Sequence, residues 1–551
     1  MRLGKSGRIW KFLDPGLLLV VTLSLFAVKP LLAGNGVYRG HDTGHHLLRM
    51  DSMRRSWSQG AYYPSLAAAT SRDCGSSVFH VCGNLTYYLT SLLQFAFNFN
   101  AIQALRWLLM LCLLMSGAGM YLFCQRRSGR LGALIGGLVY VNSPYMFYVN
   151  AQLRGAYPEL FALSLFPILL WRMDALRDAP NARNFLLLLL MEVALINTHS
   201  LSAVLMTGIA FAWLAFEAVI QSVNREASQL DSRGELWAAL ALSFGILTAA
   251  SFWLPVIWEA DSFTPGESLY EVDSNHWLSI AEQFKVAAQF SSVERPSFPE
   301  ALHIGIAQWT FALAGVSGAL ALYIRGYRTR HPHAFLGAVF FFCLSMFLIF
   351  MMTAWSQPIW DVVPALRYLQ FPWRLLGPVA VCMAYLASLN GLLLRRLPRN
   401  LRLLAIALAI AAPAVCGLAI TRTIVWNDET VAVSAADYMT NHPTGATRRA
   451  EYFPFSASKL MGQSRLPEDS AASLPIDRFD HGLLRDLSQS ALARDLGALI
   501  SALAFVGGMG IAWRLQRLRI TPRPYAAAQP LTPGELRGLL LAGAIVIVCF
   551  L

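Results

Sequence analysis

Long apolar runs recur along the whole chain, and they constrain the fold more than any other feature of the sequence. A helix needs about 20 predominantly apolar residues to cross the roughly 30 Å of hydrocarbon in a bilayer. Because hydrocarbon offers the backbone no hydrogen-bond partners, such segments must be helical. The sequence therefore predicts an all-α polytopic membrane protein with about thirteen transmembrane helices. The predicted spans are residues 16–34, 101–124, 131–149, 156–171, 184–199, 201–220, 236–257, 303–324, 334–354, 374–394, 401–421, 495–513 and 536–551.

Basic residues gather in short segments between the spans, and they predict the orientation of the chain. Residues 125–130, 325–330 and 395–399 each contain three arginines, and all of them face the cytoplasm if the N-terminus does. This is the pattern expected from the positive-inside rule. The first span is expected to stay uncleaved, since no signal-peptidase-like site follows it. The net charge of +12 thus reflects topology, and no basic surface with interleaved aromatics predicts nucleic-acid binding.

Three long polar segments, at residues 35–100, 258–302 and 422–494, all fall on the outer side in this topology. The inner segments are too short for a cytosolic domain, and no glycine-rich phosphate loop is present. In the first outer loop, residues 43–58 and 79–97 have the composition of helices that lie along the membrane surface. The predicted organisation is a transmembrane core at 1–425, an outer polar segment at 426–494 and C-terminal transmembrane helices at 495–551.

The first outer loop begins with a cluster of ionisable residues, namely His41, Asp42, His45, His46 and Arg49. Ionisable groups at the edge of a membrane are costly and often functional. Asp42 could act as a general base toward a hydroxyl group. It could instead bind a divalent metal with His45 and His46, which lie about one helical turn away. A third role would be capping of the helix predicted to follow it.

Three further groups of polar residues occur at the predicted outer ends of later spans. Arg154 could clamp a lipid phosphate with its planar guanidinium, or it could lie at the membrane surface paired with Glu159. His199, between two apolar runs, could be reactive or simply packed. Arg374 ends an arginine- and aromatic-rich segment at 367–374, which suits a phosphate or a sugar ring but also an interfacial belt.

Two of the eight cysteines, Cys74 and Cys82, lie in the first outer loop. If that loop faces an oxidising compartment, these two could form a disulfide. The other cysteines lie in or beside apolar runs, where a thiol usually behaves as a small buried hydrophobic group.

Several motifs together resemble one family. They are Gly40-His41-Asp42-x-x-x-His46-x-x-Arg49, Arg154-Gly-Ala-Tyr-Pro-Glu159 and Leu369-Gln370-Phe-Pro-Trp-Arg374. In order and spacing they resemble bacterial membrane proteins labelled "6-pyruvoyl-tetrahydropterin synthase-related". Those proteins are in turn similar to the GT-C glycosyltransferase superfamily and to YfhO-like proteins. The resemblance covers about residues 15–425.

The resemblance implies a GT-C-like helical bundle in a bacterial inner membrane, with a cytoplasmic N-terminus and large periplasmic loops. It implies sugar transfer from a polyprenyl-phosphate-linked donor to a glycan, lipid or protein acceptor on the outer face. Pterin chemistry is not expected, because a soluble zinc enzyme cannot be built from these segments. Asp42 matches the catalytic acidic residue of such enzymes, no cofactor is certain, and a divalent metal ion stays an alternative. The expected substrate-binding residues are His46, Arg49, Arg154, Glu159, His199, Gln370 and Arg374.

Two other classes of function stay open at this point. A transporter or flippase for a lipid-linked glycan would be indicated by charges in mid-span, for which Arg106 and Glu192 are the main candidates. A non-catalytic partner in an envelope complex could retain a degenerate version of the same fold. Many GT-C enzymes carry a second acidic residue, and here the sequence does not rank the candidates Glu159, Glu259, Asp261 and Asp361.

Overall fold

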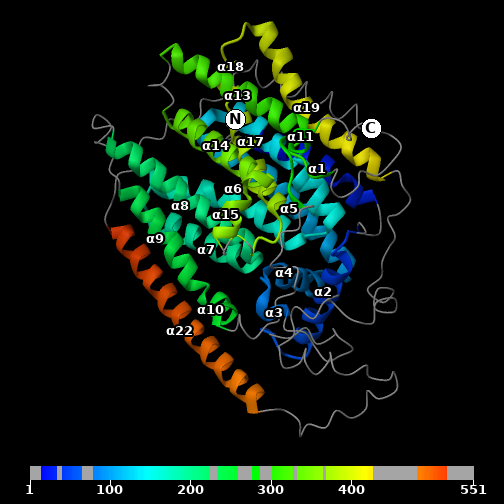
Figure 1. Ribbon diagram of the computed structural model, residues 1–551, viewed down its shortest axis with the longest axis vertical. Helices are drawn as coiled ribbons and strands as arrows, with labels where there is room; N and C mark the ends of the chain where they lie inside the picture. Colours follow the sequence, from blue (N-terminus) through cyan, green and yellow to red (C-terminus); the bar gives the residue numbers. More distant parts are fainter. Residues whose placement is uncertain are drawn as a thin grey trace, which may run out of the picture.

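A computed structural model describes residues 14–33, 37, 40–64, 78–223, 233–258, 276–285, 301–326, 332–363, 366, 368–425 and 481–517. All regular secondary structure in these ranges is helical (Figure 1), which confirms the predicted all-α class. The first half contains α1 (Pro15–Ala33), α2 (Thr43–Ser58), α3 (Val78–Val81), α4 (Leu85–Phe97), α5 (Ala101–Val141), the π-helix η2 (Tyr145–Arg154), α6 (Tyr157–Asp178), α7 (Ala182–Thr198), α8 (Ser200–Val223), α9 (Arg233–Thr248) and α10 (Ala250–Trp258). The second half contains α11 (Ile280–Gln283), α13 (Ile306–Ile324), α14 (Pro332–Met351), η9 (Ala354–Ser356), α15 (Gln357–Val362), η10 (Pro372–Leu375), α17 (Leu376–Ser388), α18 (Asn390–Leu394), α19 (Arg399–Val425) and α22 (His481–Arg517).

The helix α5 is a hairpin of two antiparallel arms. Its backbone leaves the helical conformation at Gly129, where φ is +76°. The arms pack closely, because a side chain at Gly137 would place its Cβ only 2.9 Å from the carbonyl oxygen of Gly117. The turn therefore lies within the predicted inner segment at 125–130 and separates the two spans predicted on either side of it. Glycine suits the turn because left-handed backbone costs it nothing.

Two predicted helices are interrupted. The aromatic stretch at 79–97 was expected to form one helix, but it forms α3 and α4 with a break between them. The side-chain amide of Asn84 donates a hydrogen bond to the carbonyl of Phe79 across this break. The span predicted at 236–257 is bent by 61° between α9 and α10.

Six helices in the described ranges are long and apolar enough to cross a membrane when α5 and η2 are taken together as one, or seven if the bent pair α9 and α10 counts as one span. The predicted number of thirteen is therefore not confirmed, and the span predicted at 536–551 lies outside the described residues. One reason is that α7 has only 17 residues and carries Glu192 in its interior. The described structure still has the composition of a polytopic membrane protein.

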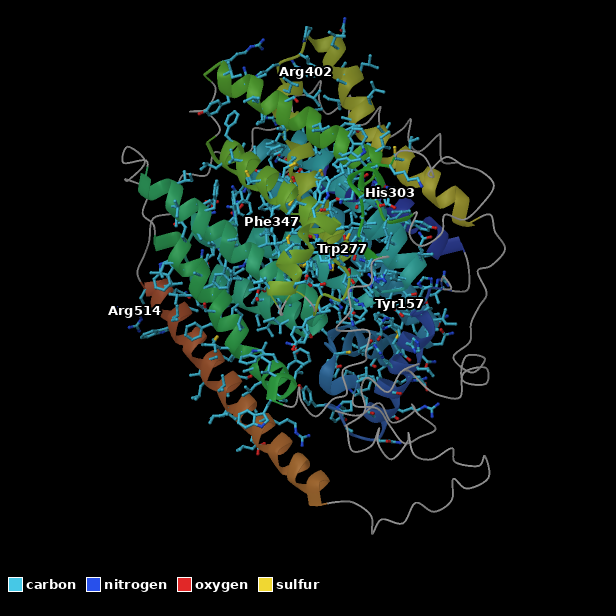
Figure 2. All side chains as sticks on the ribbon, in the orientation of Figure 1. Tyr157, Trp277, His303, Phe347, Arg402 and Arg514 are labelled. Carbon is cyan, nitrogen blue, oxygen red and sulfur yellow. The ribbon has the colours of Figure 1, made fainter. Side chains whose placement is uncertain are left out.

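The most apolar part of the segment Pro372–Leu394, which contains α17, is entirely buried and forms the centre of the bundle. It packs against α5, α13 and α14. By contrast, α22 lies along one edge and contacts α7, α9 and α10 (Figure 1). The short helices α2, α3 and α4 gather at one end of the molecule, and α18 lies toward the other (Figure 1). Arg402 lies near that second end (Figure 2).

A buried ion-pair network joins α5, α6, α8 and α9. Arg127 pairs with Asp174 (Nη2–Oδ1 2.5 Å) and with Glu217 (Nη1–Oε1 3.3 Å). Arg177 pairs with Asp174, Glu217 and Glu235. None of the five side chains is more than 6% exposed. The predicted topology puts all five near the inner ends of their spans, where the network ties four helices together.

Candidate functional site

The start of the first outer loop is held against the end of the π-helix η2. The backbone N–H of Asp42 donates to the carbonyl of Arg154 (2.8 Å). Two glycines permit this approach: a Cβ at Gly40 would lie 2.7 Å from the backbone nitrogen of Gly155, and Gly155 itself has φ +70°. The carboxylate of Asp42 is therefore carried on a backbone anchored to a segment more than a hundred residues away in the chain.

The side chain of Asp42 does not cap α2. Asp42 occupies the N-cap position, but its carboxylate makes no capping hydrogen bond. Thr43 Oγ1 instead accepts from the N–H of Gly40 (3.0 Å) and lies 2.7 Å from Tyr157 Oη. The capping role considered for Asp42 is thus wrong, and a half-buried carboxylate is left available for chemistry. It lies within electrostatic range of both Arg154 and Arg374.

His46 and Arg49 meet at the hydroxyl of Tyr87. Arg49 Nη1 donates to Tyr87 Oη (3.1 Å), which lies 2.8 Å from His46 Nδ1. Burial, followed by the nearby charge of Arg49, holds the pKa of His46 well below its ordinary value. A neutral His46 can accept a hydrogen bond from the Tyr87 hydroxyl, while the Tyr87 oxygen accepts one from Arg49. These three side chains thus form a hydrogen-bonded chain between α2 and α4.

The low pKa of His46 predicts a stability that falls with acidity. The unfolded chain takes up a proton near pH 6.5, whereas the folded chain resists it, so the free energy of unfolding should decrease as the pH falls from about 7 toward 5. Below pH 6.5 the free energy of unfolding should fall by about 1.4 kcal/mol per pH unit, until the pH reaches the pKa of His46 in the folded protein. Thermal unfolding in detergent across this range should show a shallower fall for His46→Gln than for the wild type.

The exposed His41 offers a matched control, and His41→Gln should keep the wild-type pH profile. An equally steep fall in His46→Gln would assign the acid sensitivity to another group.

Arg154 is buried and paired with Glu159. Its Nη1 donates to Glu159 Oε2 (2.9 Å) and to Asn150 Oδ1 (2.8 Å), and the ring of Trp373 lies 4.7 Å from its Cζ. Tyr145 also donates to the carboxylate of Glu159. The pairing with Glu159 that the sequence left open therefore exists, but Arg154 is only 7% exposed and does not reach to the surface. Its charge is neutralised within the protein.

Arg374 is the second arginine of this region. Its Nη2 donates to Gln370 Oε1 (2.8 Å). Its Nε and Nη1 are buried, and neither has a hydrogen-bond partner among the described residues. Unpaired buried donors of a charged group are expensive, so Arg374 is equipped to bind an anion.

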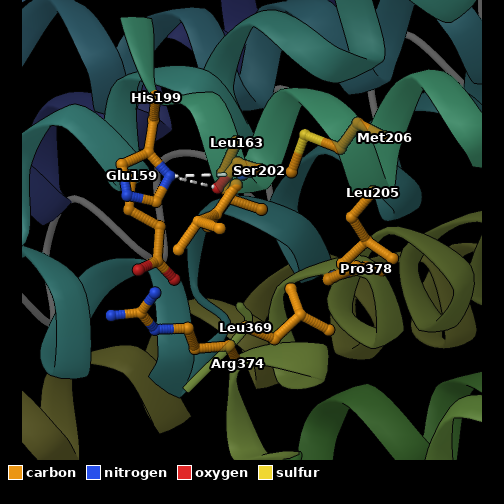
Figure 3. A pocket seen from close by; sticks show the side chains of 10 residues that line it. Glu159, Leu163, His199, Ser202, Leu205, Met206, Leu369, Arg374 and Pro378 are labelled. Atoms are coloured by element: carbon orange, nitrogen blue, oxygen red, sulfur yellow. Dashed lines mark hydrogen bonds between the residues drawn. The ribbon is translucent and has the colours of Figure 1, made fainter. Parts of the chain in front are cut away.

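These residues border one narrow pocket between α6, α8 and α17. Figure 3 shows the Glu159 carboxylate and the Arg374 guanidinium pointing toward one another across it, with His199 and Ser202 beside them. His199, at the break between α7 and α8, lies with Nδ1 2.7 Å from Ser202 Oγ. The remaining wall is apolar and consists of Leu163, Leu201, Leu205, Met206, Leu369 and Pro378. The pocket thus has a polar end and an apolar wall.

The structure brings together most of the residues singled out from the sequence. Glu159, His199 and Arg374 line the pocket, and Arg154 contacts it through Glu159. Asp42 is joined to Arg154 through the backbone. The remaining three expected residues do not line the pocket: His46 and Arg49 lie in the adjoining chain with Tyr87, and Gln370 contacts Arg374.

The described residues contain no group of three or more His, Cys, Asp or Glu side chains arranged to hold a metal ion. This includes the set Asp42, His45 and His46. Of the candidate second acidic residues, Glu159 is at the pocket and Asp361 is exposed on α15, while Glu259 and Asp261 lie outside the described residues. Cys74 also lies outside them, so its pairing with Cys82 stays a prediction.

Sequence reasoning missed the aromatic side chains that position the charged ones. They are Tyr87, Tyr145, Tyr157 and Trp373. Tyr157 lies where α6 begins, near the helices of the first outer loop (Figure 2). Of these four, only Tyr157 and Trp373 stand inside the motifs that carry the family resemblance, and that was the available signal.

Comparison with known families decides the relationship of the chain. A family described as "6-pyruvoyl-tetrahydropterin synthase related domain; membrane protein" matches residues 82–425, well over half of the sequence. The chain belongs to this family. Its members are membrane proteins by that description, in agreement with the apolar spans. No curated protein matches the chain.

Solved structures of GT-C glycosyltransferases are among those similar to the chain. The arabinofuranosyltransferase AftD from Mycobacteria is 14% identical with a TM-score of 0.49, over 76% of this chain and 27% of that one. This chain thus spans about a quarter of the length of AftD. ArnT from Cupriavidus metallidurans bound to undecaprenyl phosphate is 12% identical with a TM-score of 0.39, over 99% of this chain and 77% of ArnT. The apo state of ArnT is 14% identical with a TM-score of 0.40, over the same shares of the two chains.

Proposed function

We propose that this protein is an integral-membrane glycosyltransferase that moves a sugar from a polyprenyl-phosphate-linked donor to an acceptor on the outer face of the membrane. The observation that carries the proposal is Arg374, a half-buried cation with two buried, unpartnered nitrogens at the polar end of a pocket whose other wall is apolar. A ligand that suits both ends is an amphiphile with an anionic head.

Arg374 would hold the donor phosphate. Guanidinium groups bind phosphate oxygens through charge-assisted hydrogen bonds, which are about twice as strong as neutral ones. Arg154 would not bind the phosphate directly, because Glu159 and Asn150 already occupy it. Its role would be to hold Glu159 at the pocket and the backbone of Asp42 beside it.

The apolar wall would receive the first isoprene units of the lipid. Leu201, Leu205 and Met206 belong to α8, and Pro378 belongs to α17, so the wall is continuous with the membrane-spanning helices. The pocket is narrow, so side chains of the apolar wall would have to shift to admit a lipid.

Asp42 would act as the general base. It would remove the proton from an acceptor hydroxyl as the acceptor oxygen attacks the anomeric carbon of the sugar. The bond from that carbon to the phosphate oxygen breaks, and polyprenyl phosphate leaves with its charge balanced by Arg374. A single displacement of this kind inverts the anomeric centre.

The binding step can be tested with purified protein and undecaprenyl phosphate. Arg374→Gln should weaken binding about 10- to 100-fold, because a hydrogen-bonded charge contributes about 1.5–3 kcal/mol. Undecaprenol, which lacks the phosphate, should bind both proteins equally. Arg54→Gln, on the exposed face of α2, is the matched control and should bind like the wild type. Equal binding of undecaprenyl phosphate by Arg374→Gln and wild type would refute the proposal.

The transporter hypothesis gains no support from the two mid-span charges that motivated it. Arg106 Nε donates to the carbonyl of Leu31 at the end of α1 (2.8 Å). Glu192 accepts a hydrogen bond from Thr207 of α8 (2.6 Å). Both side chains join neighbouring helices, a structural role that needs no transported substrate.

A further inference from the structure

Gln370 has a backbone conformation that side-chain-bearing residues rarely adopt. Its φ is +64°, and Asn98 is the only other non-glycine residue with positive φ in the described part of the chain. Asparagine tolerates this region because its short polar side chain can bond locally, whereas glutamine gains no such benefit. Residues held in this way are concentrated at functional sites, where the surrounding structure enforces them.

The surroundings of Gln370 enforce its conformation from the C-terminal side. The rings of Phe371 and Trp373 stack at 4.9 Å with an interplanar angle of 8°. His276 contacts the ring of Phe371 at 4.7 Å, and Trp373 covers Arg154. The residues that follow Gln370 are thus fixed by contacts on several sides, and the turn cannot relax without disturbing them.

The side chain of Gln370 is hydrogen-bonded to Arg374. Its Oε1 accepts a hydrogen bond from Arg374 Nη2 (2.8 Å). The guanidinium also lies near Phe371, with Cζ 5.4 Å from the ring centroid. With Nη2 tied back in this way, Nε and Nη1 are the nitrogens left without a partner in the described structure.

We propose that Gln370 is a positioning residue, whose left-handed backbone is retained because it aims Oε1 at Arg374 and so presents the free donors of Arg374 to an anionic lipid head. This inference rests on the proposed function and sharpens it. Gln370 was expected to bind substrate, and here it acts through Arg374 instead. The arrangement fits the principle that binding groups need a supporting shell to fix their geometry.

The test compares Gln370→Asn and Gln370→Gly with the wild type. Both new residues accept positive φ, but neither reaches Arg374. Their melting temperatures in detergent should therefore equal that of the wild type or exceed it by up to about 3 °C. Their affinity for undecaprenyl phosphate should nevertheless fall about 5- to 10-fold, with binding of undecaprenol unchanged.

A positioning role predicts that the affinity for undecaprenyl phosphate falls while the melting temperature does not. If both variants melt lower as they bind less, Gln370 is structural and the inference is overturned. If both bind like the wild type while Arg374→Gln binds weakly, the positioning role fails and the proposed function stands. If Arg374→Gln itself binds like the wild type, the lipid-phosphate site fails and the inference fails with it.

Discussion

Replacing Asp42 by asparagine should lower the rate of sugar transfer by about 100- to 10,000-fold, the usual range for loss of a general base. Asparagine is nearly isosteric with aspartate but cannot take a proton from the acceptor. The measurement is the release of undecaprenyl phosphate from undecaprenyl-phosphoryl hexose or pentose in proteoliposomes that contain the purified protein. Donor binding should change little, because Arg374 holds the phosphate in this scheme.

Asp42→Asn also makes a clean comparison, because the carboxylate does not cap α2 and its loss should leave the melting temperature unchanged. Asp51→Asn, in α2, is the matched control: Asp51 pairs with the exposed Arg55 (2.8 Å), and its loss should spare transfer. Transfer at the wild-type rate by Asp42→Asn would remove Asp42 from the chemistry. The stability measurement separates this result from misfolding.

The largest expected loss of stability follows from Arg127→Met. This change would leave Asp174 and Glu217 buried with one arginine fewer, and breaking a buried pair in this way typically costs about 3–5 kcal/mol. The melting temperature in detergent should fall markedly. Arg127 also lies over the ring of Trp213 (Cζ to centroid 4.6 Å), so that some packing is lost as well.

Arg130→Met is the control for this variant. Arg130 lies three positions further along, beyond the break in the helix at Gly129, and pairs with Asp14 (3.1 Å), but its side chain is 26% exposed, so its loss should cost less than that of Arg127. Similar melting temperatures for Arg127→Met and Arg130→Met would mean that the buried network contributes little. A second variant that combines Arg127→Met with Asp174→Asn should regain part of the loss, because the uncompensated charge is then removed.

The fold was predictable where local pattern decides it. The predicted helix at 43–58 coincides with α2. The sequence marks its ends with a polar residue before it and Gly60 after it, and it mixes apolar and charged residues in between. Gly129 lies inside the predicted turn for a similar reason, since arginines on both sides stop the apolar run. Apolar runs and basic turns are local features, and they survive in the folded chain.

The site was only partly predictable because its contacts join distant segments. Thr43 and Tyr157 are 114 positions apart, and the sequence around either residue does not indicate that the two side chains meet. Charged residues stood out against an apolar background, so Asp42, Glu159 and Arg374 were found. The tyrosines that hold them did not stand out, because aromatics are common at membrane surfaces. The left-handed backbone of Gln370 has no signature in residue type at all.

The anchoring of the first outer loop on η2 has a consequence for how the protein is made. Chains are synthesised from the N-terminus, and earlier parts fold first. In the predicted topology the backbone around Asp42 crosses the membrane early, but it cannot form its contacts with η2 until residues 152–157 have been synthesised. The pair of Arg154 and Glu159 is then complete, while Arg374 has still to emerge. A nascent chain that stopped short of Arg374 would therefore carry its proposed base in place with no cation to receive a donor.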